Sequence, residues 1–140
     1  MMRLPATIML FAFTLVSASV CLADPAEDFR EGQAAIRAGQ IDKAIEAYTR
    51  VIKASVAAGV VDVKDLASAY NMRGMCHEAK EEAELALADY TKAIEVDVKM
   101  AEAYGNRAML YMKLGEVDKA KADATAARRI DRKVKVPDFQ

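Results

Sequence analysis

Hydrophobic side chains recur every three or four residues along nearly the whole chain after residue 24. This spacing is typical of amphipathic helices. The helical stretches come in pairs, and short breaks at 39–40, 81–82 and 115–116 separate the members of each pair. Glycine suits the left-handed backbone that ends a helix, and it stands in the first and third breaks. Because Glu81 takes that place in the middle break, we expect a less sharp turn there.

The helical pairs belong to a sequence repeat. Residues 67–100 align without a gap on residues 101–134, so the two blocks share a period of 34 residues. An earlier block, residues 25–58, aligns with both. Such self-similarity is the mark of a repeat architecture. Matching positions include Tyr70 and Tyr104, Arg73 and Arg107, Asp97 and Asp131, Gly32 and Gly74, and Tyr48 and Tyr90.

The order of residue types within each block resembles the tetratricopeptide repeat (TPR). Small residues recur in the first helix (Gly32, Gly74, Ala108) and in the second (Ala44, Ala86, Ala120), with aromatic residues at fixed offsets from them. The family's proline at the repeat end is missing, and Val98 and Arg132 stand there instead. The resemblance implies an all-α fold, a right-handed α-solenoid of three helix-turn-helix repeats over residues 24–134.

Packing considerations lead to the same arrangement. Small residues let the two helices of a pair approach closely, while larger Tyr and Leu side chains fill the space around the contact. A pair of this size cannot bury its apolar face alone. We therefore expect neighbouring pairs to stack on one another in a line.

The first and second repeats are joined by an extended junction at 59–66. Ala44 and Ala86 are 42 residues apart, whereas Ala86 and Ala120 are 34 apart, so the junction holds eight extra residues. Asp62 is suited to begin a helix as its N-cap, and Gly59 is suited to end the preceding one. We expect both helices beside the junction to be longer than the others.

Both ends of the predicted solenoid are polar. The face of the last helix that would meet a fourth repeat carries Lys121, Ala124 and Arg128, where the second repeat has Leu87, Tyr90 and Ile94. At the other end the exposed positions are Glu27, Glu31, Ala34 and Ala38. End repeats need such faces for solubility, so we expect a monomer of three repeats. Pro137 obstructs a further helix, and residues 135–140 are predicted to form a flexible tail.

Residues 1–23 have the features of a secretory signal peptide. Arg3 is their only charge, an apolar core covers residues 8–16, and small residues precede a predicted cleavage after Ala23. The protein is then exported to a bacterial periplasm or secreted. Two alternatives stay open: residues 4–22 retained as a transmembrane anchor of an assembly factor, or lipidation at Cys21.

Charge and cysteine content exclude some classes of function. Residues 24–140 carry 19 Lys and Arg against 21 Asp and Glu, which gives no basic surface for nucleic acid. The basic run from Arg128 to Lys135 suits the end of the last helix, where cations complement the helix dipole. After cleavage Cys76 is the sole cysteine, and its place in the helical pattern predicts a buried, unreactive thiol.

The resemblance also implies where a partner binds. In TPR proteins the first helices of successive repeats line a concave groove that holds a peptide of another protein. The corresponding residues are Phe29, Gln33, Ile36 and Arg37, then Asn71, Met75 and Glu78, then Gly105, Met109, Met112 and Lys113. Methionine adapts to varied apolar partners, which predicts a tolerant site, although Met109 also fits a core role.

One well-known ligand class of the family is disfavoured. TPR domains that clamp a chaperone's C-terminal carboxylate use Lys, Arg and Asn side chains. Here Glu102 and Asn106 stand at the third-repeat Lys and Arg positions, and Met72 replaces the second-repeat Asn. A cytosolic co-chaperone role is therefore not expected.

Candidate residues for catalysis are few. The chain has one histidine, His77, which could share a metal with Glu81 four residues later, but two ligands do not close a site. No phosphate-binding loop, nucleophile elbow or HExxH motif occurs. We expect a protein-binding adaptor with no catalytic residues, cofactor or metal.

Overall fold

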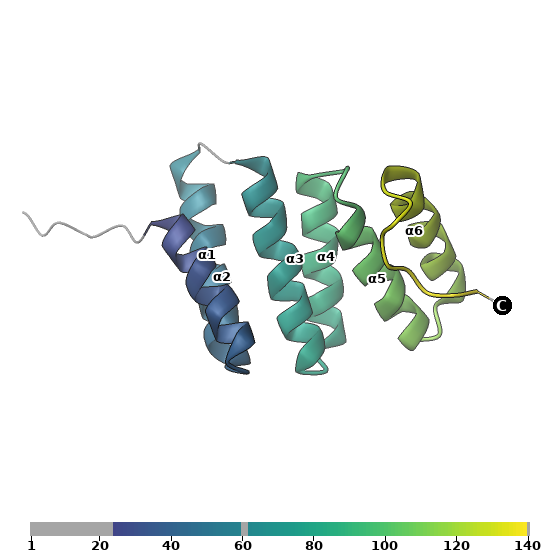
Figure 1. Ribbon diagram of the computed structural model, residues 1–140, viewed down its shortest axis with the longest axis horizontal. Coiled ribbons are helices and arrows are strands. Elements are labelled where there is room, and N and C mark those ends of the chain that lie inside the picture. Colours follow the sequence, from purple (N-terminus) through teal and green to yellow (C-terminus); the bar gives the residue numbers. More distant parts are fainter. Residues whose placement is uncertain (1–23, 60–61, 140) are drawn as a thin grey trace, which may run out of the picture.

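The structure, a computed structural model, describes residues 24–59 and 62–139. This part of the chain folds into helices without strands. Consecutive helices form hairpins that stand side by side in one line (Figure 1). The predicted all-α solenoid is confirmed. The helices are α1 (Pro25–Arg37), α2 (Ile41–Ala58), α3 (Val63–Ala79), α4 (Ala83–Val96), α5 (Ala101–Lys113) and α6 (Val117–Ile130).

The predicted signal peptide, and with it the alternatives of an anchor at 4–22 and a lipid on Cys21, lies outside the described residues. None of the helices within 24–59 and 62–139 combines the length and the apolar character that crossing a bilayer requires.

Two aspartates set the starts of α1 and α3. The Asp24 side chain accepts a hydrogen bond from the Ala26 amide at 3.0 Å, and Pro25 occupies the first helical turn. The Asp62 side chain accepts one from the Lys64 amide at 2.8 Å, as predicted for the N-cap of α3. The two helices beside the junction are the longest, with 18 residues in α2 and 17 in α3. Gly59 ends α2 at φ 63°.

The three turns inside the hairpins have the same geometry, and the expectation of a less sharp middle turn was wrong. Glu81 adopts φ 62°, beside 71° for Gly39 and 78° for Gly115. The amide of Glu82 donates to the carbonyl of His77 and that of Glu81 to Glu78, each at 2.9 Å. Equivalent bonds close the other two turns, which makes all three Schellman motifs. These bonds hold Glu81 in a conformation that its side chain disfavours.

Glycines and tyrosines face each other where the helices of a hairpin touch. A Cβ on Gly32 would lie 2.7 Å from the Tyr48 ring, and one on Gly74 would lie 2.9 Å from the Tyr90 ring. Both tyrosines are completely buried. In the third hairpin Ala108 and Ala124 occupy the corresponding positions, and both are buried. The close approach predicted for the small residues is therefore real, and a methyl group fits only where the ring is absent.

Arginines connect successive repeats. The Arg73 guanidinium on α3 donates twice to Asp89 on α4, at 2.8 and 2.7 Å, and once to Thr49 on α2 at 3.1 Å. Arg107 repeats this arrangement one period later, with bonds to Asp123 and Thr91. Each guanidinium thus fixes a hairpin to the second helix of the preceding repeat. Hydrogen bonding to Asp89 raises the pKa of Arg73, so the bridge keeps its charge.

The C-terminal segment lies against the helices instead of projecting freely. In Figure 1 residues 131–139 leave the end of α6 and cross in front of α5. Pro137 is buried, and Val134 and Val136 are half-buried. A Cβ on Gly105 would lie only 2.5 Å from the Lys135 carbonyl oxygen, so glycine is required for this approach. The expected flexible tail of 135–140 is thus, over its described residues, an extended strap across α5.

Candidate peptide-binding groove

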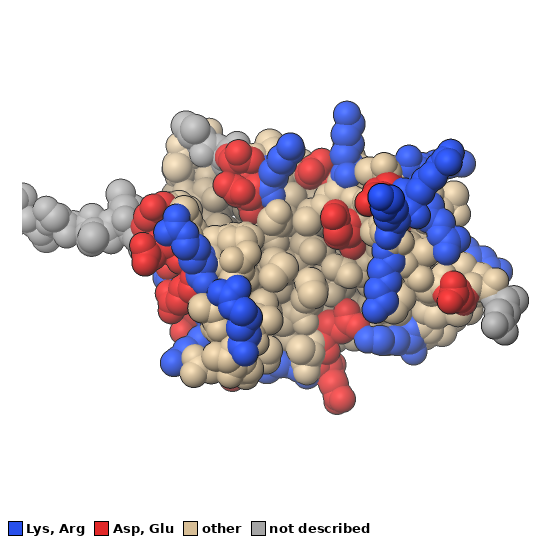
Figure 2. All heavy atoms as spheres, in the orientation of Figure 1, with Lys and Arg blue, Asp and Glu red and all other residues tan. Residues whose placement is uncertain are grey.

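The first helices of the three hairpins form one side of the molecule, which we call the groove face. Figure 1 shows α1, α3 and α5 in front, with the second helices behind them. Figure 2 shows the same face with its atoms filled in: uncharged atoms cover much of the middle, Lys and Arg side chains lie over α1 and over the strap, and Asp and Glu side chains also border the middle. A largely uncharged area between charged margins is therefore open to solvent.

The four predicted groove residues of α1 divide between core and surface. Phe29 and Ile36 pack against the buried cluster of the first two hairpins. The Phe29 ring meets the Tyr48 ring edge-on, with centroids 5.4 Å apart. Gln33 is half-buried and Arg37 is exposed. Phe29 also lines a hollow of about 450 Å³ between the ends of α1, α2 and α3.

A second hollow brings together the residues predicted from α3 and α5. Its volume is about 310 Å³, and Met75, Glu78, Asn106, Lys113 and Tyr90 line it; we call it the α3–α5 hollow. Met75 is 43% exposed, so its thioether side chain is accessible on the groove face. Three of the predicted residues thus come together here, with Asn106 between them along the groove face.

Polar contacts fix the walls of this hollow. The Tyr90 hydroxyl donates to a Glu78 carboxylate oxygen at 2.9 Å, and the Lys113 ammonium forms an ion pair with the other oxygen of that carboxylate. Burial, and then the bond to Glu78, raises the pKa of Tyr90, so the phenol stays a donor at all ordinary pH values. Glu78 and Lys113 are therefore held in place and largely neutralise each other.

Asn71 was predicted to face a ligand, but in the structure it is buried and bonds to Asn106. Its side chain is only 5% exposed, and its amide oxygen accepts a hydrogen bond from the Asn106 amide at 3.0 Å. Asn106 keeps its own carbonyl oxygen and a further N–H toward the hollow. Asn106 is not among the predicted groove residues, although it stands at a position that the carboxylate-clamping TPR domains use for a ligand.

The remaining predicted residues lie on α5. Met109 and Met112 are half-buried, and neither belongs to a buried core cluster of the described chain. Gly105 is covered by the strap, which therefore occupies one end of the third repeat's share of the groove face. The accessible part of α5 runs from Asn106 toward Lys113.

His77 is a structural residue in this arrangement. Its Nδ1 lies 2.7 Å from a carboxylate oxygen of Glu82, the residue after the predicted Glu81, and its Nε2 lies 3.8 Å from Asp89. Hydrogen bonding with His77 lowers the pKa of Glu82. Within 24–59 and 62–139 no cluster of three or more metal-ligand side chains occurs. The positive φ of Glu81 explains the change of partner, because the chain turns there and brings Glu82 back to the ring.

Comparison with known proteins agrees with this geometry. Models of the tetratricopeptide repeat match residues 29–97 and 101–133. Protein unc-45 homolog B of Danio rerio is 43% identical over 67 residues, which cover 48% of this chain but only 7% of that protein. Proteins of this family are generally interaction scaffolds rather than enzymes.

Solved structures are similar over most of the chain. The TPR domain of Arabidopsis OM64 matches with a TM-score of 0.71 and 25% identity, over 81% of this chain and 88% of that one. The TPR2B domain of yeast Sti1, in a complex with pHsp70, matches with 0.69 and 27%, over 79% and 82%. The second TPR domain of human RPAP3, in complex with an HSP70 peptide, matches with 0.65 and 25%, over 80% and 90%. The chain belongs to the tetratricopeptide repeat family.

Proposed function

We propose that this protein is a non-enzymatic adaptor that binds an extended peptide of another protein along its groove face, centred on the α3–α5 hollow. The observation that carries the proposal is the exposed Met75 side chain beside Asn106, whose orientation is fixed from behind by Asn71. An apolar anchor with a few oriented polar groups is the usual composition of a ligand site.

The lining of the hollow suggests how the peptide is held. Met75 offers flexible apolar surface to one side chain of the ligand. The free amide groups of Asn106 suit the N–H and C=O of an extended backbone. Because Glu78 and Lys113 already neutralise each other, a strongly charged ligand side chain gains little there. The site favours an apolar residue within an extended segment.

The ligand differs from a free C-terminal carboxylate. Two of the similar domains were solved with Hsp70 or an HSP70 peptide. In this chain Glu102 is exposed at the start of α5, and a carboxylate near it would be repelled. A peptide that ends in an amide should therefore bind at least as tightly as the same peptide ending in a carboxylate.

A peptide selection tests this proposal. Random peptides displayed with blocked C-termini are selected on the immobilised protein, and a selected peptide is then measured by fluorescence anisotropy. We expect Met75→Glu and Asn106→Ala each to weaken binding about tenfold or more, since each removes an interaction at the centre of the site. Leu85→Glu, at an exposed apolar position on α4, is the matched control and should leave affinity unchanged. If Met75→Glu and Asn106→Ala bound the peptide as tightly as Leu85→Glu does, the proposal would be contradicted.

Export is a further part of the proposal. It is supported by the composition of residues 1–23 and by the position of Asp24, since cleavage after Ala23 would leave the N-cap of α1 intact. N-terminal sequencing of the protein recovered from expressing cells should give Asp24 as the first residue. A start at Met1 or Met2 would contradict it.

A further inference from the structure

The outer face of α6 carries a cluster of exposed cations. Lys121, Arg128 and Arg132 surround a hollow of about 640 Å³ that Phe139 borders on one side. None of the three forms an ion pair within residues 24–59 and 62–139. In contrast, Arg50, Arg73 and Arg107 each bind a carboxylate of the neighbouring helix. Among the described residues, the charge of the α6 face therefore has no carboxylate partner.

This hollow occupies the position where a following helix would pack. Between the second and third repeats, Ile94 of α4 packs in one cluster with Ala103 of α5, and Tyr90 packs in another with Leu110. The 34-residue period places Arg128 where the preceding repeat has Ile94, and Ala124 where it has Tyr90. The α6 face thus has the shape of a helix-binding surface, with a basic lining in place of an apolar one.

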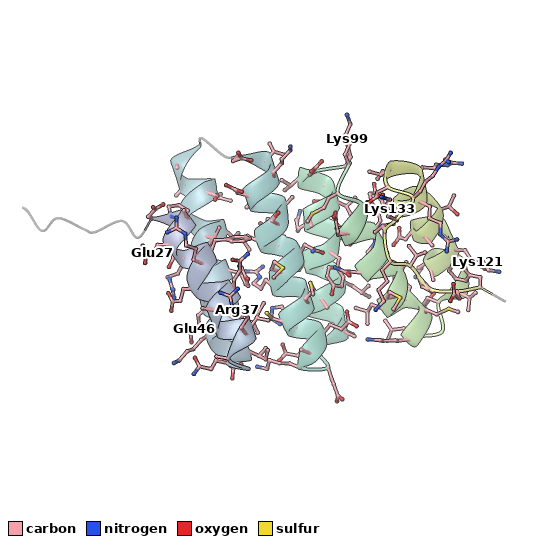
Figure 3. All side chains as sticks on the ribbon, in the orientation of Figure 1. Glu27, Arg37, Glu46, Lys99, Lys121 and Lys133 are labelled. Atoms are coloured by element: carbon pink, nitrogen blue, oxygen red, sulfur yellow. The ribbon has the colours of Figure 1, made fainter. Side chains whose placement is uncertain are left out.

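The helix with matching chemistry is at the other end of the same chain. On α1, Glu27 stands at the position of Ala103, Glu31 at that of Arg107 and Ala34 at that of Leu110. These three residues are exposed. Glu31 pairs with Arg50 of α2, so Glu27 is the acidic residue of this set without an ion pair among the described residues. The outer face of α1 is therefore acidic and lined with small side chains, and Figure 3 shows Glu27 and Lys121 at opposite ends of the molecule.

We propose that copies of this protein associate head to tail, with α1 of one copy packed on the α6 face of the next. The register is that of Ile94 on α4 against Ala103 on α5. Arg128 stands at the position of Ile94 and Glu27 at that of Ala103, so Arg128 of one copy lies opposite Glu27 of the next. The hydrogen bond from Arg107 to Thr91 corresponds to Glu31 facing Thr125. The Thr125 hydroxyl donates to the Lys121 carbonyl at 2.8 Å, and in the contact it would exchange that bond for one to the carboxylate. Ala34 and Ala124 replace larger side chains and leave room for the charged ones.

The charge distribution along the solenoid gives this contact its polarity. Residues 24–100 carry ten Lys and Arg against fifteen Asp and Glu, whereas residues 101–140 carry nine against six. Figure 2 shows Lys and Arg gathered over the α6 end. Two acidic ends repel each other, as do two basic ends, whereas an acidic α1 end attracts a basic α6 end. The polar ends, which suggested a monomer, therefore permit contact in one orientation, head to tail. A head-to-tail contact whose rotation does not close into a ring produces open chains of protein copies.

Sedimentation velocity of the protein, as recovered from cells expressing the full chain, tests the proposal. At low ionic strength the weight-average sedimentation coefficient should rise with concentration and not level off at a dimer. Because salt screens exposed charges, moderate salt should return the protein to a monomer. A monomer at every concentration and at low salt would overturn the proposal.

Charge-reversed variants identify the surfaces. Glu27→Arg and Arg128→Glu should each abolish association alone, while an equimolar mixture of the two should associate, because the intact face of each fits the other. The double variant should also associate. Glu84→Arg, exposed on α4 between the two ends, is the control and should behave as wild type. Loss of association in the double variant would overturn the register.

An anionic membrane is the competing occupant of the α6 face. Cosedimentation with phosphatidylglycerol vesicles distinguishes it. If the protein stays monomeric but binds these vesicles, and Arg128→Glu abolishes that binding, the face is a lipid-binding surface and the head-to-tail proposal is overturned. Self-association with no Arg128-dependent vesicle binding is the result we expect.

Discussion

Glu81 holds a backbone conformation that favours glycine, at φ 62°. The left-handed region costs a residue with a Cβ about 1 kcal/mol or more. We predict that Glu81→Gly raises the free energy of unfolding by about 1 kcal/mol, because glycine adopts this conformation freely and the turn stays the same. Urea unfolding measures the difference.

The converse substitution is the control for Glu81. Gly115 lies at φ 78° with no atom within 4 Å of a Cβ built on it, so Gly115→Ala changes only backbone strain. It should lower stability by about 1 kcal/mol. A stability loss in Glu81→Gly would mean that contacts of the Glu81 side chain outweigh the strain.

The two buried tyrosines differ in their hydroxyl groups. The Tyr90 hydroxyl donates to Glu78, whereas the Tyr48 hydroxyl has no hydrogen-bond partner among the described residues, since Ile36 stands at the position of Glu78. Tyr90→Phe should lower the free energy of unfolding by about 1.5 kcal/mol or more, because it removes a hydrogen bond to a charged group. Tyr48→Phe should leave stability unchanged or raise it by about 1 kcal/mol. Chemical unfolding of both variants checks the pair, and equal losses would contradict this account.

Cys76 should be unreactive in the folded protein. Burial, and then the charge of Asp89, raises the pKa of its thiol from 9.0 to about 11. At pH 8 the folded protein should react with a disulfide reagent about a hundredfold more slowly than the urea-unfolded protein, because the thiolate fraction falls tenfold per pKa unit. Rates that match in the two states would contradict the buried position.

The same pKa shift affects stability at high pH. Only the unfolded chain ionises this thiol between pH 9 and about pH 11, so its contribution to stability is complete below pH 9 and is lost as pH rises through this window. Cys76→Ala should remove that part of the decline, as measured by unfolding at a series of pH values.

At the scale of elements, the helices were predictable because apolar residues recur at helical spacing and because residue type marks the ends of several of them. Asp62 and Gly59 placed the long helices beside the junction from residue type alone. The middle turn was not predictable in this way, since the Schellman bonds that hold Glu81 are made by backbone groups and leave no trace in residue type. The partnership of Asn71 with Asn106 depends on stacking between repeats, which the linear pattern does not specify.

The strap was missed for a similar reason. Val134 and Val136 form too short an apolar pattern to predict an element, and the significance of Gly105 appears only when the Lys135 backbone lies against it. We predict that Gly105→Ala displaces the strap, since a Cβ would lie 2.5 Å from the Lys135 carbonyl oxygen. Trypsin should then cleave after Lys133 and Lys135 several times faster than in the wild type.

Gly59→Ala is the control for this experiment. Gly59 has no atom of the described residues within 4 Å of a built Cβ, so alanine there adds only the strain of φ 63°, and it lies at the opposite end of the solenoid. In Gly59→Ala, trypsin should cleave the strap at the wild-type rate. Unchanged cleavage in Gly105→Ala would show that the strap does not depend on this contact.

At the scale of the whole molecule, the repeat predicted the architecture, since hairpins too small to bury their apolar faces alone must stack on their neighbours. The groove follows from that stacking, because it places α1, α3 and α5 on one side. What the period did not reveal is which groove residues remain accessible. Phe29 and Ile36 belong partly to the core and Asn71 is buried, so the open centre reduces to Met75, Asn106 and the pair of Glu78 with Lys113.

The most direct test of the groove is site-specific photo-crosslinking in living cells. A photoreactive amino acid at Met75 should link this protein to a discrete partner, whereas the same residue at Leu85 on α4 should not. The Asn106→Ala change should weaken the crosslink from Met75. A partner captured equally at both positions, or from Leu85 alone, would contradict the assignment of the binding surface to the groove face.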